Sequence, residues 1–196
     1  MVDPGIGAAS VVERALARLE LEPVAVLLTH GHLDHAADAH LLGGRFRIPT
    51  LCHPADHAMV TQPSLGLGPA FADALAAWGI DEVPQPPGLR GFEPTEQIAG
   101  LQVTCTHSPG HTPGSVVLRV EDQGEAVVLT GDVVFAGSIG RTDLPGGSMA
   151  EMLQSLRRIV DEVPEDLALL PGHGRSTTLA AELHSNPYLS RDFLEG

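Results

Sequence analysis

Short apolar runs bounded by turn residues recur along this chain, and between them lie stretches with apolar positions at helical spacing. Runs of this kind are typical of buried strands. They predict strands over residues 24–28, 48–52, 101–106, 115–120, 126–129 and 167–170. The helical spacing predicts helices over residues 10–21, 34–42, 54–60, 69–78, 148–160 and 177–184. Polar residues 121–125 predict a hairpin between two of the strands, and the Pro- and Gly-rich residues 61–91 are the least informative.

Two predicted helices begin with the pattern of a capping box, in which Ser or Thr is followed three residues later by Glu. Ser10 with Glu13 marks the start of the first helix, and Ser148 with Glu151 marks the start of the fifth. A pair of glycines at residues 43–44 is expected to end the second helix.

Length, charge and cysteine content narrow the class of protein. We expect one domain over residues 1–196, large enough to bury a core. Eleven Lys and Arg against 25 Asp and Glu give a net charge of −14, which argues against a nucleic-acid partner because phosphate binding relies on cations. Cys52 and Cys105 stand apart, and the chain has no apolar leader or span. We therefore expect a cytoplasmic protein without disulfides or a membrane partner, and its oligomeric state is not indicated.

The segment directly after the first predicted strand carries the strongest chemical signal. His30, His32, Asp34 and His35 fall within six consecutive positions, on the turn that leaves the strand. His30 and His32 are two residues apart, so extended backbone lets one metal bind both. Asp34 and His35 continue the turn and are placed to serve a second metal. Imidazole with a carboxylate suits Zn, Fe or Mn, so the cluster predicts a metal site.

Three further segments place metal-ligand residues after strand-like runs. His111 lies in the segment Ser-Pro-Gly-His-Thr-Pro-Gly-Ser, Asp132 in Leu-Thr-Gly-Asp, and His173 in Leu-Pro-Gly-His-Gly. Together with the His-x-His-x-Asp-His cluster, these segments resemble the metallo-β-lactamase-fold superfamily in order and spacing. The resemblance covers nearly the whole chain. It implies an α/β fold, an αββα sandwich of two mixed β-sheets flanked by helices, with metals at one edge.

The resemblance also implies a division of ligands between two divalent metal ions, most simply zinc, with iron or manganese as alternatives. His30, His32 and His111 would bind the first metal, Asp34, His35 and His173 the second, and Asp132 would bridge both. Asp34 and Asp132 would then be the catalytic carboxylates that hold a metal-bridging hydroxide for attack on a carbonyl. The lactam-cleaving subclasses that use a cysteine ligand do not match, so antibiotic hydrolysis is disfavoured.

Residues 131–144 are the best discriminator within the superfamily, and they resemble the short bacterial type of glyoxalase II, or hydroxyacylglutathione hydrolase. This implies hydrolysis of a small-molecule thioester such as S-lactoylglutathione, with Arg141 contacting the thiol carrier. An ion pair of Arg141 with Asp143 is the alternative. Two other activities of the same fold stay open: an Fe(II)-dependent persulfide dioxygenase and, as a minor option, a phosphodiesterase or ribonuclease.

The amino terminus departs from the family pattern. In the family, the residues that match Asp3-Pro4-Gly5 normally follow two or three strands. Either the protein lacks part of its first sheet, or its reading frame begins upstream of Met1. We expect the recorded start to lie inside a longer reading frame. Asp3 resembles a family aspartate that supports a metal ligand, and a plain turn residue before Pro4 is the alternative.

Overall fold

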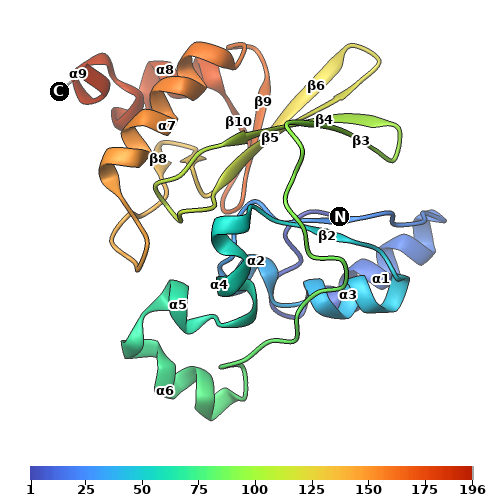
Figure 1. The fold of residues 1–196 in the computed structure, drawn as a ribbon. Helices are drawn as coiled ribbons and strands as arrows, with labels where there is room; N and C mark the ends of the chain where they lie inside the picture. Colours follow the sequence, from blue (N-terminus) through green and yellow to red (C-terminus); the bar gives the residue numbers. More distant parts are fainter. Residues whose placement is uncertain (196) are drawn as a thin grey trace. The chain divides into compact units, whose positions relative to one another are not determined.

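The structure is a computed structural model that describes residues 1–195, and these divide into two compact units at the boundary between Phe92 and Glu93. Figure 1 shows their elements in sequence colours, from blue to red. The single domain expected over residues 1–196 stays a prediction. No helix among residues 1–195 is long and apolar enough to span a membrane.

The first unit contains a short parallel sheet surrounded by helices. Strand β1 (Val26–Leu27) pairs in parallel with β2 (Thr50–Leu51), and Val2 forms an isolated bridge to Leu27. The helices of the unit, seen in Figure 1, are α1 (Ala8–Leu19), α2 (Leu33–Ala36), α3 (Ala39–Phe46), the 3₁₀ turn η1 (Pro54–Asp56), α4 (His57–Thr61), α5 (Ser64–Leu67) and α6 (Pro69–Trp78). Helix α6 has the bounds that the sequence predicts.

Two clusters of buried apolar side chains hold this unit together. The larger joins the strands to α2 and α3 and includes Val26, Leu28, Leu42 and Ile48. The smaller is made of Leu33, Leu75 and Val83, with Leu67 and Ile80 packed against it. Because Leu33 begins α2 and Leu75 belongs to α6, the smaller cluster fixes α6 beside the start of α2.

Helix α1 begins earlier than its capping pattern predicts, so the role assigned to Ser10 is wrong. Its N-cap is Gly7, and the Ala9 N–H donates to Oδ2 of Asp38 over 2.7 Å. A carboxylate 29 residues away in the chain thus satisfies a free N–H of the first turn, which a local capping box would otherwise serve.

The helix predicted over residues 34–42 is two helices, α2 and α3, and the glycine pair does not end the second one. Both glycines lie inside α3, which ends at Phe46 with Arg47 in the left-handed conformation. A Cβ on Gly43 would lie 3.1 Å from the Pro87 ring and 3.4 Å from the Ile48 carbonyl oxygen. The absence of a side chain at position 43 therefore permits close packing rather than a helix end.

The second unit is built on a six-stranded mixed sheet with the order β10-β9-β6-β5-β4-β3. Strands β6 and β9 are parallel neighbours, and the other neighbouring pairs are antiparallel. The strands are β3 (Thr95–Ile98), β4 (Leu101–His107), β5 (Val116–Asp122), β6 (Glu125–Gly131), β9 (Ala168–Pro171) and β10 (Thr177–Thr178). A separate hairpin joins β7 (Val134–Phe135) to β8 (Ser138–Ile139), and the helical elements are α7 (Met149–Glu162), α8 (Leu179–Ser185), η2 (Pro187–Leu189) and α9 (Arg191–Glu195).

Two local predictions in this unit are confirmed. The side chain of Ser148 caps α7 by accepting a hydrogen bond from the Glu151 N–H over 3.3 Å. Strands β5 and β6 form the expected hairpin, with Gln123 and Gly124 at positive φ in its turn. The sequence pattern gave no signal for β3, β7, β8 or β10, which are short.

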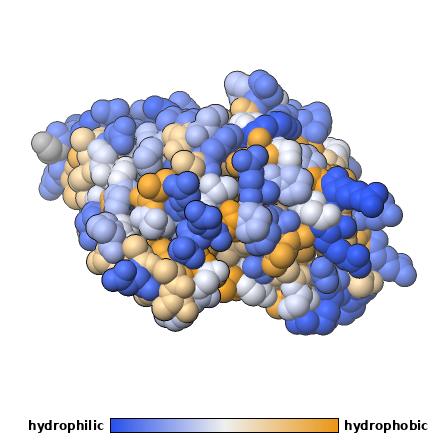
Figure 2. All heavy atoms as spheres, turned by 60° about the horizontal axis from the view of Figure 1, so that its bottom comes forward, coloured by the Kyte–Doolittle hydropathy of each residue, from blue (hydrophilic) through white to orange (hydrophobic). Residues whose placement is uncertain are grey.

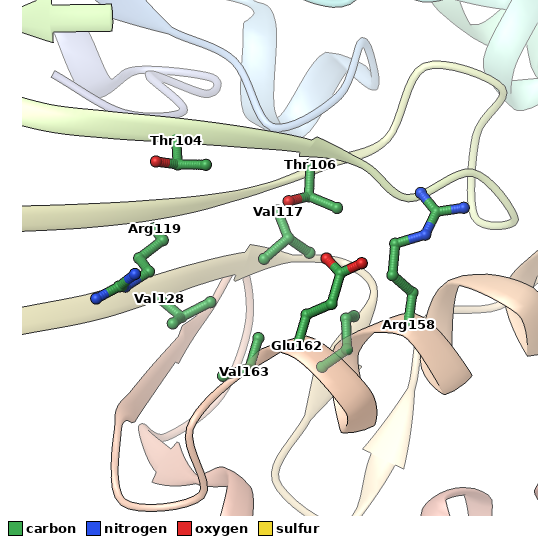
Figure 3. A pocket seen from close by; sticks show the side chains of 9 residues that line it. Thr104, Thr106, Val117, Arg119, Val128, Arg158, Glu162 and Val163 are labelled. Carbon is green, nitrogen blue, oxygen red and sulfur yellow. The ribbon is translucent and has the colours of Figure 1, made fainter. Parts of the chain in front are cut away.

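Helix α7 packs on the sheet through Met152, Leu156 and Ile159, which are buried in the core of the second unit. A cleft of about 130 Å³ remains between this helix and the sheet, and Figure 3 shows Glu162 of α7 pointing toward Val117 of β5. None of the seven predicted metal ligands lines this cleft, so it is not the predicted site.

Candidate metal centre

Three histidine rings gather on the turn after β1. The ring centroids of His30 and His32 are 4.9 Å apart, and those of His30 and His35 are 4.1 Å apart. All three side chains are buried. His32 is the N-cap of α2 and His35 lies in its single turn, so the change from extended strand to helix brings the rings together. The clustering expected for these residues is therefore present in the first unit.

Asp3 orients two of these imidazoles, that of His35 directly and that of His30 through the Thr29 hydroxyl. Nδ1 of His35 lies 3.0 Å from Oδ2 of Asp3, and the Thr29 hydroxyl donates to the same oxygen over 2.7 Å. The Thr29 N–H donates to Oδ1 of Asp3, also over 2.7 Å. Because the Thr29 hydroxyl proton points to Asp3, its oxygen accepts from Nδ1 of His30, 3.1 Å away. Both rings thus carry their proton on Nδ1, which leaves Nε2 as the metal-binding atom.

Asp34 lies beside His35 at a separation typical of two ligands of one ion. Its Oδ2 is 3.7 Å from Nε2 of His35, beyond the usual length of a hydrogen bond. Two atoms that each lie about 2.1 Å from a tetrahedral ion are about 3.4 Å apart. The Asp34 side chain is 53% exposed, so it stands at the open side of the cluster.

Asp56 is a supporting residue that the sequence did not single out. Its side chain is fully buried, and its Oδ2 accepts a hydrogen bond from the Gly31 N–H over 2.8 Å. Gly31 lies between His30 and His32. This contact therefore holds the backbone of the turn after β1 that carries the candidate metal ligands, called the ligand turn below. Asp56 looks like an ordinary acidic residue in the first turn of a helix, and nothing local in the sequence separates it from that role.

In the second unit, Asp132 lies between two histidines. Its Oδ2 is 3.6 Å from Nε2 of His111 and 3.7 Å from Nε2 of His173. Asp132 follows β6 and His173 follows β9, and these strands are parallel neighbours. The carboxyl ends of neighbouring parallel strands meet at one edge of a sheet, which explains why residues so far apart in sequence converge.

His111 is held by the segment that contains Arg141. Its Nδ1 lies 2.8 Å from the Arg141 carbonyl oxygen, which leaves Nε2 toward Asp132. Gly140 makes this approach possible, because a Cβ there would lie 1.8 Å from the Asp132 carbonyl oxygen and 3.2 Å from Nδ1 of His111. Gly110, at φ 139°, likewise leaves no room for a side chain against the backbone of Met152.

The Arg141 side chain forms the ion pair that the sequence left as an alternative to substrate binding. Its Nε and Nη2 atoms donate to the two carboxylate oxygens of Asp143 over 2.7 and 2.8 Å. This hydrogen bonding lowers the pKa of Asp143 to about 2. Both side chains are well exposed, so the pair is accessible from solvent.

Neither cysteine is an activated thiol. Cys52 is fully buried among apolar side chains, and no disulfide joins it to Cys105. Burial, with the nearby charge of Glu96, raises the pKa of Cys105 to about 12. A nucleophilic thiol needs a lowered pKa. The donor sets of the two units, imidazoles with carboxylates, instead fit divalent zinc, iron or manganese.

Comparison with known proteins decides the family. The family model described as the metallo-beta-lactamase superfamily matches residues 1–173. The chain belongs to this superfamily. Its α/β fold, with a mixed sheet flanked by helices, is confirmed as that of metallo-β-lactamases. It is a metallo-hydrolase superfamily whose members bind divalent metals, often two.

Several known proteins resemble the chain over most of its length. A Mycobacterium tuberculosis protein, Rv2581c, is 43% identical over 96% of this chain and 86% of its own. Hydroxyacylglutathione hydrolase GloC of Haemophilus influenzae is 31% identical, over 97% of this chain and 86% of its own length. Among crystal structures, the BLEG-1 B3 metallo-beta-lactamase matches with a TM-score of 0.79 and 35% identity, over 96% of this chain and 87% of that chain. The crystal structure of TTHA1623 in a di-iron-bound form matches with a TM-score of 0.77 and 36% identity, over 95% of this chain and 87% of that chain.

Proposed function

We propose that this protein is a binuclear metal-dependent hydrolase that cleaves thioesters of a small thiol, in the manner of a hydroxyacylglutathione hydrolase. In this proposal His30, His32 and His111 hold one metal, Asp34, His35 and His173 hold the other, and Asp132 bridges them. The observation that carries the proposal is the position of Asp132, with one carboxylate oxygen 3.6 and 3.7 Å from two imidazole nitrogens. A carboxylate between two imidazoles is what a bridging ligand requires.

The comparisons support the two parts of the proposal separately. The similarity to TTHA1623, crystallised with two irons, supports a binuclear centre. The similarity to GloC supports a thioester of the hydroxyacylglutathione kind as the substrate. The metal is zinc in our proposal, with iron as the alternative because imidazole and carboxylate ligands suit both.

When bound, the metals would lower the pKa of a bound water toward ~7 and polarise the substrate carbonyl. The chain's own residues fix where this happens. Asp3 and the Arg141 carbonyl hold His35 and His111 by their Nδ1 atoms, so that each presents Nε2. Asp34 and Asp132 supply negative charge, which keeps divalent cations in place.

The net reaction consumes one water for each thioester. The oxygen of water bonds to the acyl carbon and the carbon–sulfur bond breaks. The thiol leaves with its bonding electron pair and takes one proton of the water, and the product acid gives up another to solvent. Because the water is the nucleophile, the unreactive state of Cys105 and the burial of Cys52 are consistent with this chemistry.

The test is release of free thiol from S-D-lactoylglutathione by protein reconstituted with zinc, alongside metal analysis. We expect two metals per chain and turnover that depends on added metal. Asp132→Ala should lose activity and at least one metal, whereas Asp166→Ala, which removes an exposed carboxylate of the same unit, should leave both unchanged. Full metal loading and activity in Asp132→Ala would overturn the bridging role. A single iron per chain, with oxygen consumed on a persulfide substrate, would point to the dioxygenase instead.

Hydrolysis of β-lactams is a second candidate, favoured by one observation. The BLEG-1 B3 metallo-beta-lactamase is 35% identical to this chain. Asp132 and the absence of a cysteine ligand exclude only the cysteine-dependent subclasses. A chromogenic cephalosporin assayed beside the thioester distinguishes the two: we expect a kcat/KM for the thioester that exceeds that for the lactam by orders of magnitude. The reverse order would replace the thioesterase assignment.

A further inference from the structure

An apolar groove lies within the first unit, next to the ligand turn. It has a volume of about 590 Å³, and eight of its nine lining residues are apolar. The ninth is Asp34. Of the lining residues, Leu33 and Leu75 are buried, whereas Phe71 and Trp78 of α6 are 49% and 72% exposed. Figure 2 shows hydrophobic residues exposed among hydrophilic ones on the surface.

We propose that this groove binds the apolar acyl chain of the thioester substrate. The inference rests on the proposed function, because that function places a metal at Asp34 and therefore the thioester carbonyl beside it. Asp34 both lines the groove and lies 3.7 Å from Nε2 of His35. A thioester carbonyl has two substituents, the acyl chain and the thiol carrier. With the carbonyl held at the metals, one of them is positioned to enter the groove that Asp34 lines.

The chemistry of the lining favours the acyl chain over the thiol carrier. No Lys, Arg or His lines the groove, and its single charged group is a carboxylate. A carrier with carboxylates, such as glutathione, would find no cationic side chain along the groove. A hydrocarbon chain would instead cover Phe71 and Trp78, whose exposure to water is unfavourable.

The size of the groove favours a small molecule over a protein partner. Small-molecule clefts have volumes of roughly 300–1,000 Å³ and are mostly apolar with a few polar groups at fixed places. The groove fits this description, because eight of its nine lining residues are apolar and the ninth, Asp34, is a ligand in the proposed metal centre. We therefore infer a preference for acyl groups longer than lactoyl, up to medium-chain length.

Trp78 makes binding measurable without turnover, because it is the single tryptophan of the chain. The probes are the butyl, hexyl and octyl thioethers of N-acetylcysteamine, which are uncharged and cannot be hydrolysed. Titrated into zinc-reconstituted protein, they should shift the Trp78 emission to shorter wavelength in a saturable way. Each added CH₂ should lower Kd by up to about fourfold, the factor that ~0.8 kcal/mol gives.

Phe71→Ala should weaken binding of the octyl probe by about tenfold or more. Val11→Ala is the matched control, because Val11 is a 58% exposed apolar residue of α1 outside the groove. Circular dichroism confirms that both variants are folded. An absent shift, a Kd independent of chain length, or equal effects of the two variants would overturn the proposal. So would a shift that depends on protein concentration without probe, because it would identify a second copy as the occupant.

Turnover separates this inference from the proposed function. With acetyl, hexanoyl and octanoyl thioesters of N-acetylcysteamine, kcat/KM should rise with chain length, and Phe71→Ala should reduce the octanoyl-to-acetyl ratio about tenfold. Hydrolysis without chain-length preference or probe binding would overturn the groove and leave the thioesterase. Probe binding without hydrolysis of any thioester would overturn the thioesterase and with it the acyl assignment, leaving an apolar-ligand site.

Discussion

Oδ2 of Asp3 lies 3.0 Å from Nδ1 of His35, so a carboxylate near the start of the chain orients an imidazole on the turn after β1. The same carboxylate accepts hydrogen bonds from the backbone and hydroxyl of Thr29. Asp3 is held at a positive φ of 46°, an uncommon conformation for a residue other than Gly. It is therefore more than a turn residue before Pro4.

Replacing Asp3 with Ala should lower metal affinity by about 10–100-fold, because an imidazole that loses its Nδ1 partner loses both orientation and basicity. Zinc affinity measured by competition with a chromophoric chelator tests this. Asp81→Ala removes an exposed carboxylate of the same unit and should bind zinc as the parent does. Unchanged zinc affinity in Asp3→Ala would show that His35 needs no such support.

Asp56 offers a second test of the ligand turn. Asp56→Ala leaves the Gly31 N–H without its acceptor, which should cost roughly 2 kcal/mol of unfolding free energy. For a chain of this size that corresponds to a fall in Tm of about 4–8 °C. Asp56→Asn keeps an acceptor oxygen and should recover most of the loss. If Asp56→Asn and Asp56→Ala lower Tm equally, the hydrogen bond from the Gly31 N–H does not account for the stability that Asp56 provides.

The predictions that succeeded rest on information close together in the chain. The rings of His30, His32 and His35 cluster as their close spacing predicts, and Ser148 caps α7 through a residue three positions away. The β5–β6 hairpin likewise follows from a polar turn between two apolar runs. In each case the partners are neighbours, so propensity and spacing describe the interaction.

The features that the sequence missed depend on distant partners. Ser10 has a good capping pattern, yet Asp38 serves the first turn of α1 from another helix. Asp56 reaches Gly31 from 25 residues away, and nothing local distinguishes it from other acidic residues. The sequence predicts a helix end at Gly43, but this residue lies within α3, where a Cβ would lie 3.1 Å from the Pro87 ring. Tertiary contacts overrode local preference at each of these positions.

The ion pair of Arg141 with Asp143 predicts opposite effects of two substitutions. If Arg141 contacts the thiol carrier, Arg141→Ala should raise KM for S-D-lactoylglutathione about tenfold and leave kcat nearly unchanged. Asp143→Ala should lower KM, because it releases the guanidinium that now donates to Asp143 over 2.7 and 2.8 Å. Steady-state kinetics of the two variants decide this. If neither substitution changes KM, Arg141 does not contact the carrier. Its contacts are then the ion pair with Asp143 and the hydrogen bond between its carbonyl oxygen and His111.

Glu182 joins three elements of the second unit through one buried carboxylate. It accepts hydrogen bonds from the Gly137 N–H, from Nδ2 of Asn186 and from the Thr177 hydroxyl, over 2.7, 2.9 and 2.6 Å. Burial by itself raises the pKa of the Glu182 carboxyl. The three hydrogen bonds, with the charge of Arg175, outweigh burial and bring its pKa below the ordinary 4.5.

Because its pKa is lower in the folded state, the Glu182 carboxylate stabilises the protein fully above pH 4.5, and this contribution is lost as the pH falls through its folded-state pKa. Glu182→Gln should destabilise the protein by roughly 1–3 kcal/mol at pH 7, since an amide cannot accept from all three donors. The deficit relative to the parent should shrink as the pH falls below 4.5. Urea unfolding of both proteins between pH 7 and 3 measures it, with the exposed Glu165→Gln as the control. A deficit that stays constant over this range would mean that the charge of Glu182 contributes nothing, and that the substitution acts only through packing.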